Sequence, residues 1–352
     1  MQAPPEEEET VGGYLSSWLQ HSKTRVRAKT HEGYEGLVRL YARPGIGDIP
    51  LASLSPLHLQ RLYADLLSDP LRHLSGGTVL NLHLVLTQAL SQAVRWGYIS
   101  SNPAAGAQPP RPRRAELLSM DEAATKHILA ATAGTRLECP VAIAIATGMR
   151  RGEILGLRWS DIDEHDTIAH VRRTIQPTKA GLVIENPKTR RSRRAVVLPE
   201  FLHPYLERQR NDQARRKSKA GAAWSENDLV IDRGDGSALN PDTLSSGWAR
   251  FLRLAGLPHV RFHDLRHAHA TLMLQQGVHP KIVSERLGHA SIGITLDTYS
   301  HVLPAMQAEA AAAFDELFGA RGPARLADED PANPGSSRLG KSSTHPAGFV
   351  GS

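Results

Sequence analysis

The chain has 352 residues, of which 40% are hydrophobic, 22% are charged and 5% are aromatic, and its formal net charge is +6. A chain of this length is expected to form two domains, and its positive charge favours a polyanionic partner. Its single cysteine, Cys139, excludes an internal disulfide and a zinc cluster built from cysteines. The N-terminus lacks the basic and apolar regions of a signal peptide, and no apolar run approaches the ~20 residues that span a bilayer. We therefore expect a protein without membrane contact, in the cytoplasm or associated with the nucleoid.

The N-terminal third of the chain is predicted to be helical. Residues 1–9 form an acidic lead that is expected to be disordered, and residues 10–102 an all-α domain of four helices. The pair Ser55-Pro56 is typical of a helix start, because serine caps the first turn and proline is tolerated at its first position. The longest helix is expected over residues 78–96, where leucines recur at helical spacing.

A proline-rich basic linker is predicted over residues 103–116. Such a segment is extended and semi-rigid, and it serves either as a spacer or as a strap that lies along phosphates. Residues 117–320 then form a second domain. Residues 321–352 are rich in proline, glycine and serine with little apolar content, so we expect a disordered tail.

The second domain is expected to be mostly helical with a small sheet. Its strand-like runs are separated by turn-rich residues and predict a three-stranded antiparallel sheet. An alanine-rich amphipathic helix is expected near the end of the domain, over residues 305–318. The predicted fold class is therefore mainly α, with an all-α four-helix domain followed by an α+β domain. The three strand-like runs are residues 167–174, 182–185 and 195–198.

Positive charge is concentrated in two segments of the second domain. Residues 188–194 (KTRRSRR) contain five positive charges, and residues 208–219 contain six. Phosphate contacts supply most non-specific affinity for nucleic acids, so these segments favour a nucleic-acid partner. With 5% aromatic residues, stacking of bases on exposed rings is not expected to be the main binding mode.

Two cationic residues are candidates for direct chemistry. Arg150 follows Gly148 at an expected helix start, with Glu153 three residues further on the same face. A surface ion pair is the alternative interpretation of that spacing. Lys188 lies where a strand enters a charged turn. A lysine at such a tip is either simply solvated or able to deliver its ammonium to a leaving oxygen.

The segment with most candidates is residues 261–271 (RFHDLRHAHAT). If it is helical, His263, Arg266 and His267 share one face. We interpret His267 and His269 as packing or supporting residues rather than direct participants. The spacing of His263 and His267 also resembles a zinc-protease motif. A cation between the two ligands and the lack of a clear third ligand disfavour that interpretation.

Two more candidates follow. His289 comes directly after Gly288, which is expected to end a helix that begins at Pro280. Tyr299 is expected on the next helix, where most tyrosines are packing residues, yet it is the one candidate nucleophile of the set. Arginine forks, histidine donors and a lysine suit the non-bridging oxygens of a phosphodiester. The combination predicts a phosphoryl-transfer site.

The order of these motifs resembles the tyrosine recombinases of the phage integrase family. The resemblance covers about residues 10–318, and residues 10–102 look like the family's core-binding, SAM-like domain. The similar motifs are residues 147–155 (TGMRRGEIL) for the first arginine, 187–189 (PKT) for the hairpin lysine, 263–266 (HDLR) for the His-x-x-Arg box, 287–289 (LGH) for the last histidine and 297–301 (DTYSH) for the nucleophile.

This resemblance implies a site-specific DNA recombinase that needs neither a metal ion nor a nucleotide cofactor. Tyr299 would attack a DNA phosphate, form a 3′-phosphotyrosyl bond and release a 5′-hydroxyl. The two arginines and the last histidine would hold the phosphate, the lysine would protonate the leaving oxygen, and His263 would help to accept the tyrosine proton. The cationic surroundings are expected to favour the phenolate. The candidate catalytic residues are Arg150, Lys188, His263, Arg266, His289 and Tyr299.

The resemblance also implies partners. They are double-stranded DNA with core-type sites, three further copies of the chain in a homotetramer that passes through a Holliday junction, and, where the direction of recombination is regulated, a directionality factor. The helix at 305–318 would dock on a neighbouring subunit, or pack on its own domain. Many family members carry an additional N-terminal module for arm-type sites, whereas only an acidic segment precedes residue 10. We therefore expect either that no arm sites are needed or that the start has been lost.

Two other functions fit part of the pattern. A type IB topoisomerase shares the tyrosine and the arginines but relaxes DNA as a monomer, and the helical N-terminal domain and the details of the motifs favour a recombinase. A non-catalytic DNA-binding protein would lack at least one of the six candidate residues, and all six are present.

Overall fold

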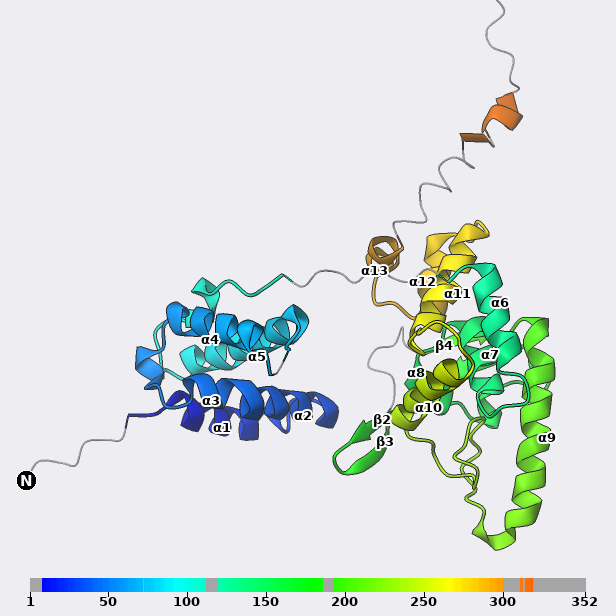
Figure 1. Ribbon diagram of the computed structural model, residues 1–352, viewed down its shortest axis with the longest axis horizontal. Helices are drawn as coiled ribbons and strands as arrows, with labels where there is room; N and C mark the ends of the chain where they lie inside the picture. The colour runs from blue at the N-terminus through cyan, green and yellow to red at the C-terminus, as the bar shows by residue number, and fades with distance from the viewer. Residues whose placement is uncertain are drawn as a thin grey trace, which may run out of the picture. The chain divides into compact units, whose positions relative to one another are not determined.

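In the computed structural model of the chain, helices dominate and β-structure is confined to short strands of the described part (Figure 1). The chain divides into two units, Met1–Pro304 and Ala305–Ser352. None of the described helices is both long and apolar enough to cross a membrane. The structure describes residues 8–71, 73–111, 120–185, 193–299, 311–312 and 314–318.

The N-terminal region is helical, as predicted. Helices α2 and α3 are continuous through a π-helical turn, so the region contains four helical runs. Ser55 caps α4 in a capping box with His58, and Ser75 caps α5 by accepting a hydrogen bond from the Thr78 amide. The elements are α1 (Val11–Ser22), α2 (Ala28–Leu37), the π-turn (Val38–Ala42), α3 (Arg43–Ile46), α4 (Pro56–Ser68) and α5 (Gly76–Arg95), with a 3-10 turn at Leu51–Ser53.

These helices enclose one hydrophobic core, to which every helical run contributes. Tyr14, Leu15 and Trp18, which fall at helical spacing in the sequence, are buried in it. Other leucines that fit the helical pattern point outward: Leu57 is 57% exposed and Leu84 is 56% exposed. Helical periodicity therefore located the helices, although not every leucine that fits the period is buried.

The first residues of the predicted linker belong to this helical region. Pro103–Gly106 form a 3-10 helix, and Ala104 and Ala107 are buried in the helical core. Asn102 fixes the turn, because its side chain accepts a hydrogen bond from the Ala104 amide and donates to Ser91. Residues 112–116 of the predicted linker lie outside the described residues.

The second part of the chain is built around α7. Most of this helix is buried, and it contacts α6, α8, α9 and α11. Its uniform apolar character explains why it occupies the centre of the core rather than the surface. The helices here are α6 (Glu122–Ala131), α7 (Glu138–Thr147), α8 (Arg151–Leu155), α9 (His203–Ala220), α10 (Pro241–Leu254), α11 (Asp264–Gln275), α12 (Pro280–Leu287) and α13 (Ile292–Thr298), with 3-10 turns at Trp159–Asp161, Glu200–Leu202 and Gly221–Ala223.

The β-structure is antiparallel, as predicted, but the described strands form two separate pairs instead of one three-stranded sheet. The predicted strand over residues 167–174 is interrupted at Arg172 and Arg173, which both pair with Asp161. The chain therefore passes at Arg172 and Arg173 from the first strand pair to the second. The pairs are β1 (Ile168–Val171) with β4 (Arg194–Val197), and β2 (Thr174–Thr178) with β3 (Gly181–Glu185).

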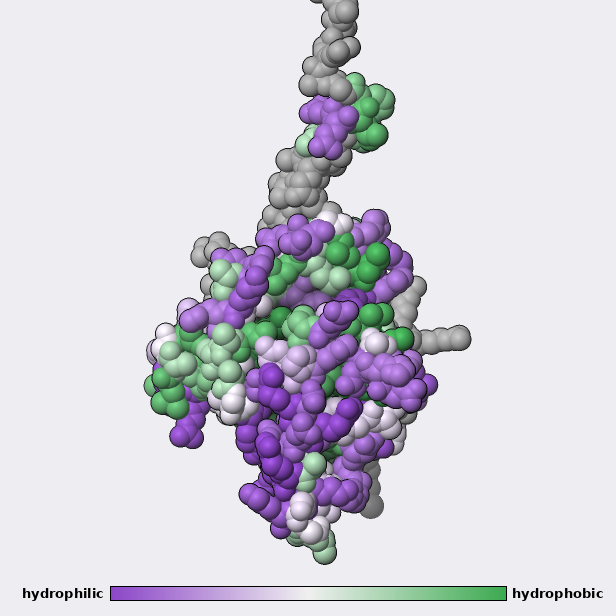
Figure 2. Space-filling model, turned by 90° about the vertical axis from the view of Figure 1, so that its right-hand side faces the viewer, coloured by the Kyte–Doolittle hydropathy of each residue, from purple (hydrophilic) through white to green (hydrophobic). Residues whose placement is uncertain are grey.

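The basic segment at residues 208–219 lies on α9, on a largely hydrophilic face of the molecule (Figure 2). Most of its cations have acidic partners within the chain, so the segment presents less free positive charge than its sequence indicates. Exposed pairs of this kind add little stability. The pairs are Arg208–Glu138, Arg210–Asp166, Arg215–Asp212, Arg216–Asp232 and Lys217–Glu226.

In the C-terminal unit the structure describes only residues 311–312 and 314–318, and they are helical. The helix expected over residues 305–318 is therefore confirmed for these described residues. The rings of Phe314 and Phe318 stack with centroids 5.8 Å apart, and both side chains are exposed. Whether this helix docks on another subunit stays a prediction.

Candidate functional site

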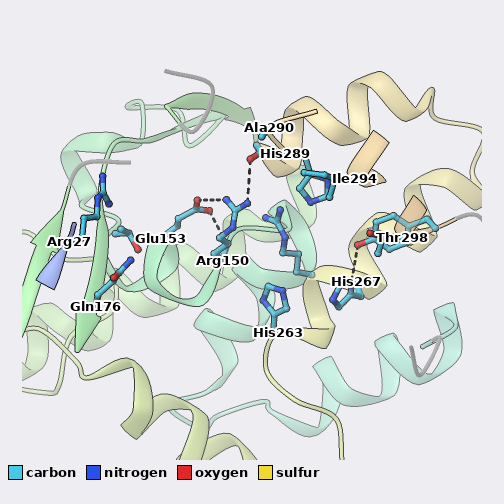
Figure 3. Close-up of a pocket in the computed structure, with 14 residues that line it drawn as sticks. Arg27, Arg150, Glu153, Gln176, His263, His267, His289, Ala290, Ile294 and Thr298 are labelled. Carbon is cyan, nitrogen blue, oxygen red and sulfur yellow. Dashed lines mark hydrogen bonds and ion pairs between the residues drawn. The ribbon is translucent and has the colours of Figure 1, made fainter. Parts of the chain in front are cut away.

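A cleft of about 580 Å³ brings together five of the six candidate residues (Figure 3). They come from the start of α8, from α11 and its cap, and from the loop and helix that follow α12. The sixth candidate, Lys188, lies outside the described residues. The five that line the cleft are Arg150, His263, Arg266, His289 and Tyr299.

Arg150 is positioned by the turn that ends α7. Gly148 adopts φ +63°, and a Cβ at this position would lie 2.6 Å from carbon atoms of the His269 and Leu287 side chains. Only glycine fits such a turn without strain. Arg150 then caps α8: its backbone N–H donates to Glu153 Oε2 at 2.9 Å and its Nη1 to Glu153 Oε1 at 3.0 Å.

Glu153 is a buried anchor rather than half of a surface ion pair. Its side chain is 5% exposed, and Arg194, whose side chain is 6% exposed, donates to both carboxylate oxygens at 2.9 and 3.2 Å. Burial alone would raise the pKa of Glu153, but the charges and hydrogen bonds of Arg194 and Arg150 lower it below its ordinary value. The carboxylate therefore stays ionised and holds two guanidinium groups in place.

The importance of Arg194 was missed in the sequence, where it was one charge of a basic run. The alternation of inward and outward side chains along β4 could have indicated that Arg194 is buried. Arg194 and the buried Val196 are two residues apart on this strand and so point to the same face.

Arg266 is held inside the cleft by backbone carbonyl groups. It is 3% exposed, and it donates to Gly148 O from Nη1 at 2.6 Å and to Leu287 O from Nη2 at 2.9 Å. Burial and the neighbouring Arg150 charge lower its pKa, although a guanidinium remains protonated at neutral pH. A buried cation of this kind favours an anion in the cleft.

His289 is fixed by the end of α12 and by α13. Gly288 takes φ +67° and ends α12, as predicted, so the chain turns and His289 donates its backbone N–H to Ser284 O at 3.0 Å. The His289 Nδ1 forms a 2.8 Å hydrogen bond with Thr295 Oγ1. Burial, with the Arg266 and Arg150 charges, lowers the pKa of His289 to about 4. Its ring is therefore neutral at pH 7.

Tyr299 is the C-terminal cap of α13 and is 1% exposed. Its ring packs in a small apolar cluster with Leu274, Val283 and Leu287. Burial raises the pKa of its hydroxyl to about 12, and the Arg266 charge offsets this only in part. The expectation that cationic surroundings favour the phenolate is therefore wrong for the DNA-free protein, because desolvation outweighs the nearby charge.

The Tyr299 hydroxyl is hydrogen-bonded to His267, not to His263. His267 Nδ1 lies 2.9 Å from the hydroxyl oxygen, drawn as a dashed line in Figure 3. His263 occupies the N-cap position of α11, and its ring packs edge-on against the His267 ring with centroids 5.1 Å apart. The sequence spacing places the His263 and His267 rings on one helix face. The position of Tyr299 then decides which of the two rings contacts its hydroxyl. His269 is a packing residue, as expected, and bonds the Ile145 carbonyl at 2.7 Å.

The arrangement suits a phosphate that is attacked by an oxygen nucleophile. Two guanidinium groups fixed by carbonyls and by Glu153 can stabilise charge on non-bridging oxygens without reorganising. Neutral His289 offers a further hydrogen bond to the same oxygens. A cleft of this kind is suited to phosphoryl transfer with a tyrosine oxygen as the nucleophile.

Comparison with known proteins agrees with this class. Residues 116–306 match the phage integrase family, and residues 10–67 match the N-terminal SAM-like domain of phage integrases. A XerC-like tyrosine recombinase of Caldanaerobacter subterraneus subsp. tengcongensis is 30% identical over 329 residues, which cover 88% of this chain and 83% of the relative.

Two solved structures share the fold. The Tn1549 transposon integrase in complex with transposon right-end DNA has a TM-score of 0.74 at 20% identity, covering 86% of this chain and 99% of the other. A lambda integrase tetramer bound to a Holliday junction has a TM-score of 0.59 at 18% identity, covering 81% and 76%. The chain belongs to the phage integrase family and is a tyrosine site-specific recombinase.

Proposed function

We propose that this protein cuts and rejoins DNA at core-type sites through a covalent bond between Tyr299 and a 3′-phosphate. The observation that carries the proposal is the single cleft in which Tyr299 lies with Arg150, His263, Arg266 and His289. In a chain of the phage integrase family, such a cleft supports the integration or excision of a mobile DNA element.

In the proposed cleavage step the Tyr299 oxygen attacks the phosphorus, its hydroxyl proton passes to a histidine of the cleft, the new P–O bond forms and the P–O5′ bond breaks. Arg150 and Arg266 neutralise the two non-bridging oxygens, and His289 donates a hydrogen bond to one of them. Lys188 gives a proton to the departing 5′-oxygen. The energy of the broken bond is retained in the phosphotyrosine, so a 5′-hydroxyl of a partner duplex can reverse the step without a nucleotide cofactor.

We assign residues 10–102 to a core-binding domain and residues 117–320 to the catalytic domain, with the two domains acting on double-stranded DNA. Strand exchange between two duplexes needs four active sites. The lambda integrase tetramer on a Holliday junction, which has the same fold, supports a homotetramer here. The helix around residues 314–318, with its exposed phenylalanines, is our candidate for the contact between subunits. A directionality factor would bind this assembly and set the direction of recombination. The assembly would form on chromosomal DNA.

A plasmid assay tests this function against the topoisomerase alternative. The core site is first selected from a random duplex pool with Tyr299→Phe protein, and two direct copies are placed on a supercoiled plasmid. We expect the wild type to produce two circles and to leave a plasmid without sites supercoiled. Relaxation of the site-free plasmid without recombination of the other would instead establish a topoisomerase.

The same plasmid tests the role of Arg150. Arg150→Ala is expected to bind the site but to cleave it about 10²–10³-fold more slowly, because one fixed donor to the developing charge is lost. Arg151→Ala is the matched control: the Arg151 guanidinium is tied to Asp242 and Ser245, and cleavage should stay close to wild type. Loss of DNA binding by Arg150→Ala would place this arginine in recognition instead.

A further inference from the structure

We infer that His267 is the catalytic base that takes the proton of the Tyr299 hydroxyl, in place of His263. The inference rests on the proposed function, because it requires Tyr299 to be the nucleophile. It changes the role expected from the sequence, where His267 is interpreted as a packing or supporting residue.

The contact geometry carries this assignment. The His267 Nδ1 is 2.9 Å from the Tyr299 oxygen, within the distance at which a base removes a proton. The two rings lie with centroids 5.9 Å apart and tilted by 54°, so the contact is made through the ring nitrogen and the hydroxyl rather than by stacking. Among the described residues, His263 contacts this pair by packing its ring against the His267 ring.

The surroundings fix both partners of this hydrogen bond. The Tyr299 ring is held by apolar side chains of α11 and α12, and His267 lies on α11 between the buried residues Arg266 and Ala268. A pair built on packed helices keeps its geometry without help from substrate. Because burial raises the pKa of Tyr299 to about 12, attack at neutral pH requires a group that removes the proton as the bond forms.

The charges around His267 keep it able to accept that proton. Burial lowers its pKa, as do Arg266 and Arg261, while Asp264 raises it; His263 packs against its ring. The ring is therefore neutral at pH 7, with a free electron pair on Nδ1 when the hydrogen is on Nε2. In cleavage the proton passes from Tyr299 to Nδ1 as the O–P bond forms. In rejoining, the imidazolium returns it to the departing phenolate.

The test is the pH dependence of covalent adduct formation on a nicked suicide duplex that carries the selected site. Single-turnover rates are measured from about pH 5.5 to about pH 9.5, a range that covers histidine titration and lies below tyrosine titration. As the pH increases, the wild-type rate should rise while His267 loses its proton and should become constant before pH 7 is reached. His267→Asn places an amide group near the Nδ1 position, so it keeps a hydrogen bond but cannot act as a base.

We expect His267→Asn to bind the duplex normally and to cleave about 10²–10⁴-fold more slowly at pH 7. Its rate should rise about tenfold per pH unit, since only the phenolate fraction then reacts. If the asparagine variant is not folded under the assay conditions, His267→Gln replaces it, and the same loss of rate and the same pH dependence are expected. His127→Asn, on the exposed surface of α6, is the matched control and should behave like the wild type.

Three outcomes are decisive against the assignment. A wild-type rate and plateau in His267→Asn would overturn it. Loss of the plateau in His263→Asn, but not in His267→Asn, would return the base to His263. If the wild type formed no adduct, or Tyr299→Phe still formed one, the proposed function itself would fail, and the inference with it.

Discussion

Replacing Glu153 by glutamine should destabilise the second domain strongly. The Glu153 carboxylate accepts hydrogen bonds from the Arg194 guanidinium at 2.9 and 3.2 Å and from Arg150 Nη1 at 3.0 Å, and both Glu153 and Arg194 are almost fully buried. Glu153→Gln removes the negative charge. It also replaces one accepting carboxylate oxygen by an amide NH₂ group, which is a donor and faces the guanidinium donors. Breaking a buried pair costs about 3–5 kcal/mol. For a domain of this size that corresponds to a fall in melting temperature of roughly 6–20 °C.

Thermal and urea denaturation at neutral pH measure this change. The control is Glu122→Gln, which removes an exposed helical pair with Lys126 and should change the free energy of unfolding by less than about 0.5 kcal/mol. The pKa of Glu153 is lowered in the folded state, so its stabilisation is present above the unfolded value near 4.5 and is lost as pH falls through the folded value. The gap between wild type and variant should therefore close in acid. A Glu153→Gln protein that melts within 2 °C of wild type would refute the view of Glu153 as a buried anchor.

Two further predictions concern the same cleft. Gly148→Ala should lower stability by about 1–2 kcal/mol or more in urea denaturation, because the residue has φ +63° and its Cβ would meet His269 and Leu287. Gly33→Ala, in a helix where a Cβ meets nothing within 4 Å, should be neutral or stabilising, and equal effects of the two would contradict the strain argument. In the DNA-free protein labelled with [ζ-¹³C]tyrosine, the resonance lost in Tyr299→Phe should titrate near pH 12. A midpoint at or below about 10 would show that Arg266 outweighs burial.

Local sequence signals located most of the fold. Ser55-Pro56 marks the start of α4, and Gly288 ends α12 with positive φ, as expected from residues that favour these positions. The same applies to the cleft, because the types and the order of five residues in the sequence predict a shared site: Arg150, His263, Arg266, His289 and Tyr299. Each signal depends on a few neighbouring residues, and this is why it can be read from sequence.

Contacts between distant segments could not be predicted in this way. Arg194 and Glu153 are 41 residues apart, and the charge run around Arg194 indicated a solvated surface. His263 and His267 lie on one helix face, and the packing of Tyr299 in the cluster below α11 decides which of them meets its hydroxyl. The pKa of Tyr299 depends on the balance between burial and a nearby charge, which residue types alone do not reveal.

The covalent bond to Tyr299 is tested most directly by mapping the adduct on the nicked suicide duplex. Wild-type protein should give an SDS-stable complex, and mass spectrometry of its nuclease- and protease-digested peptides should find a nucleotide attached to Tyr299. Tyr299→Phe should give no complex, whereas Tyr205→Phe, a tyrosine on α9, should react like the wild type. A nucleotide attached to another residue, or an adduct that persists in Tyr299→Phe, would contradict the account.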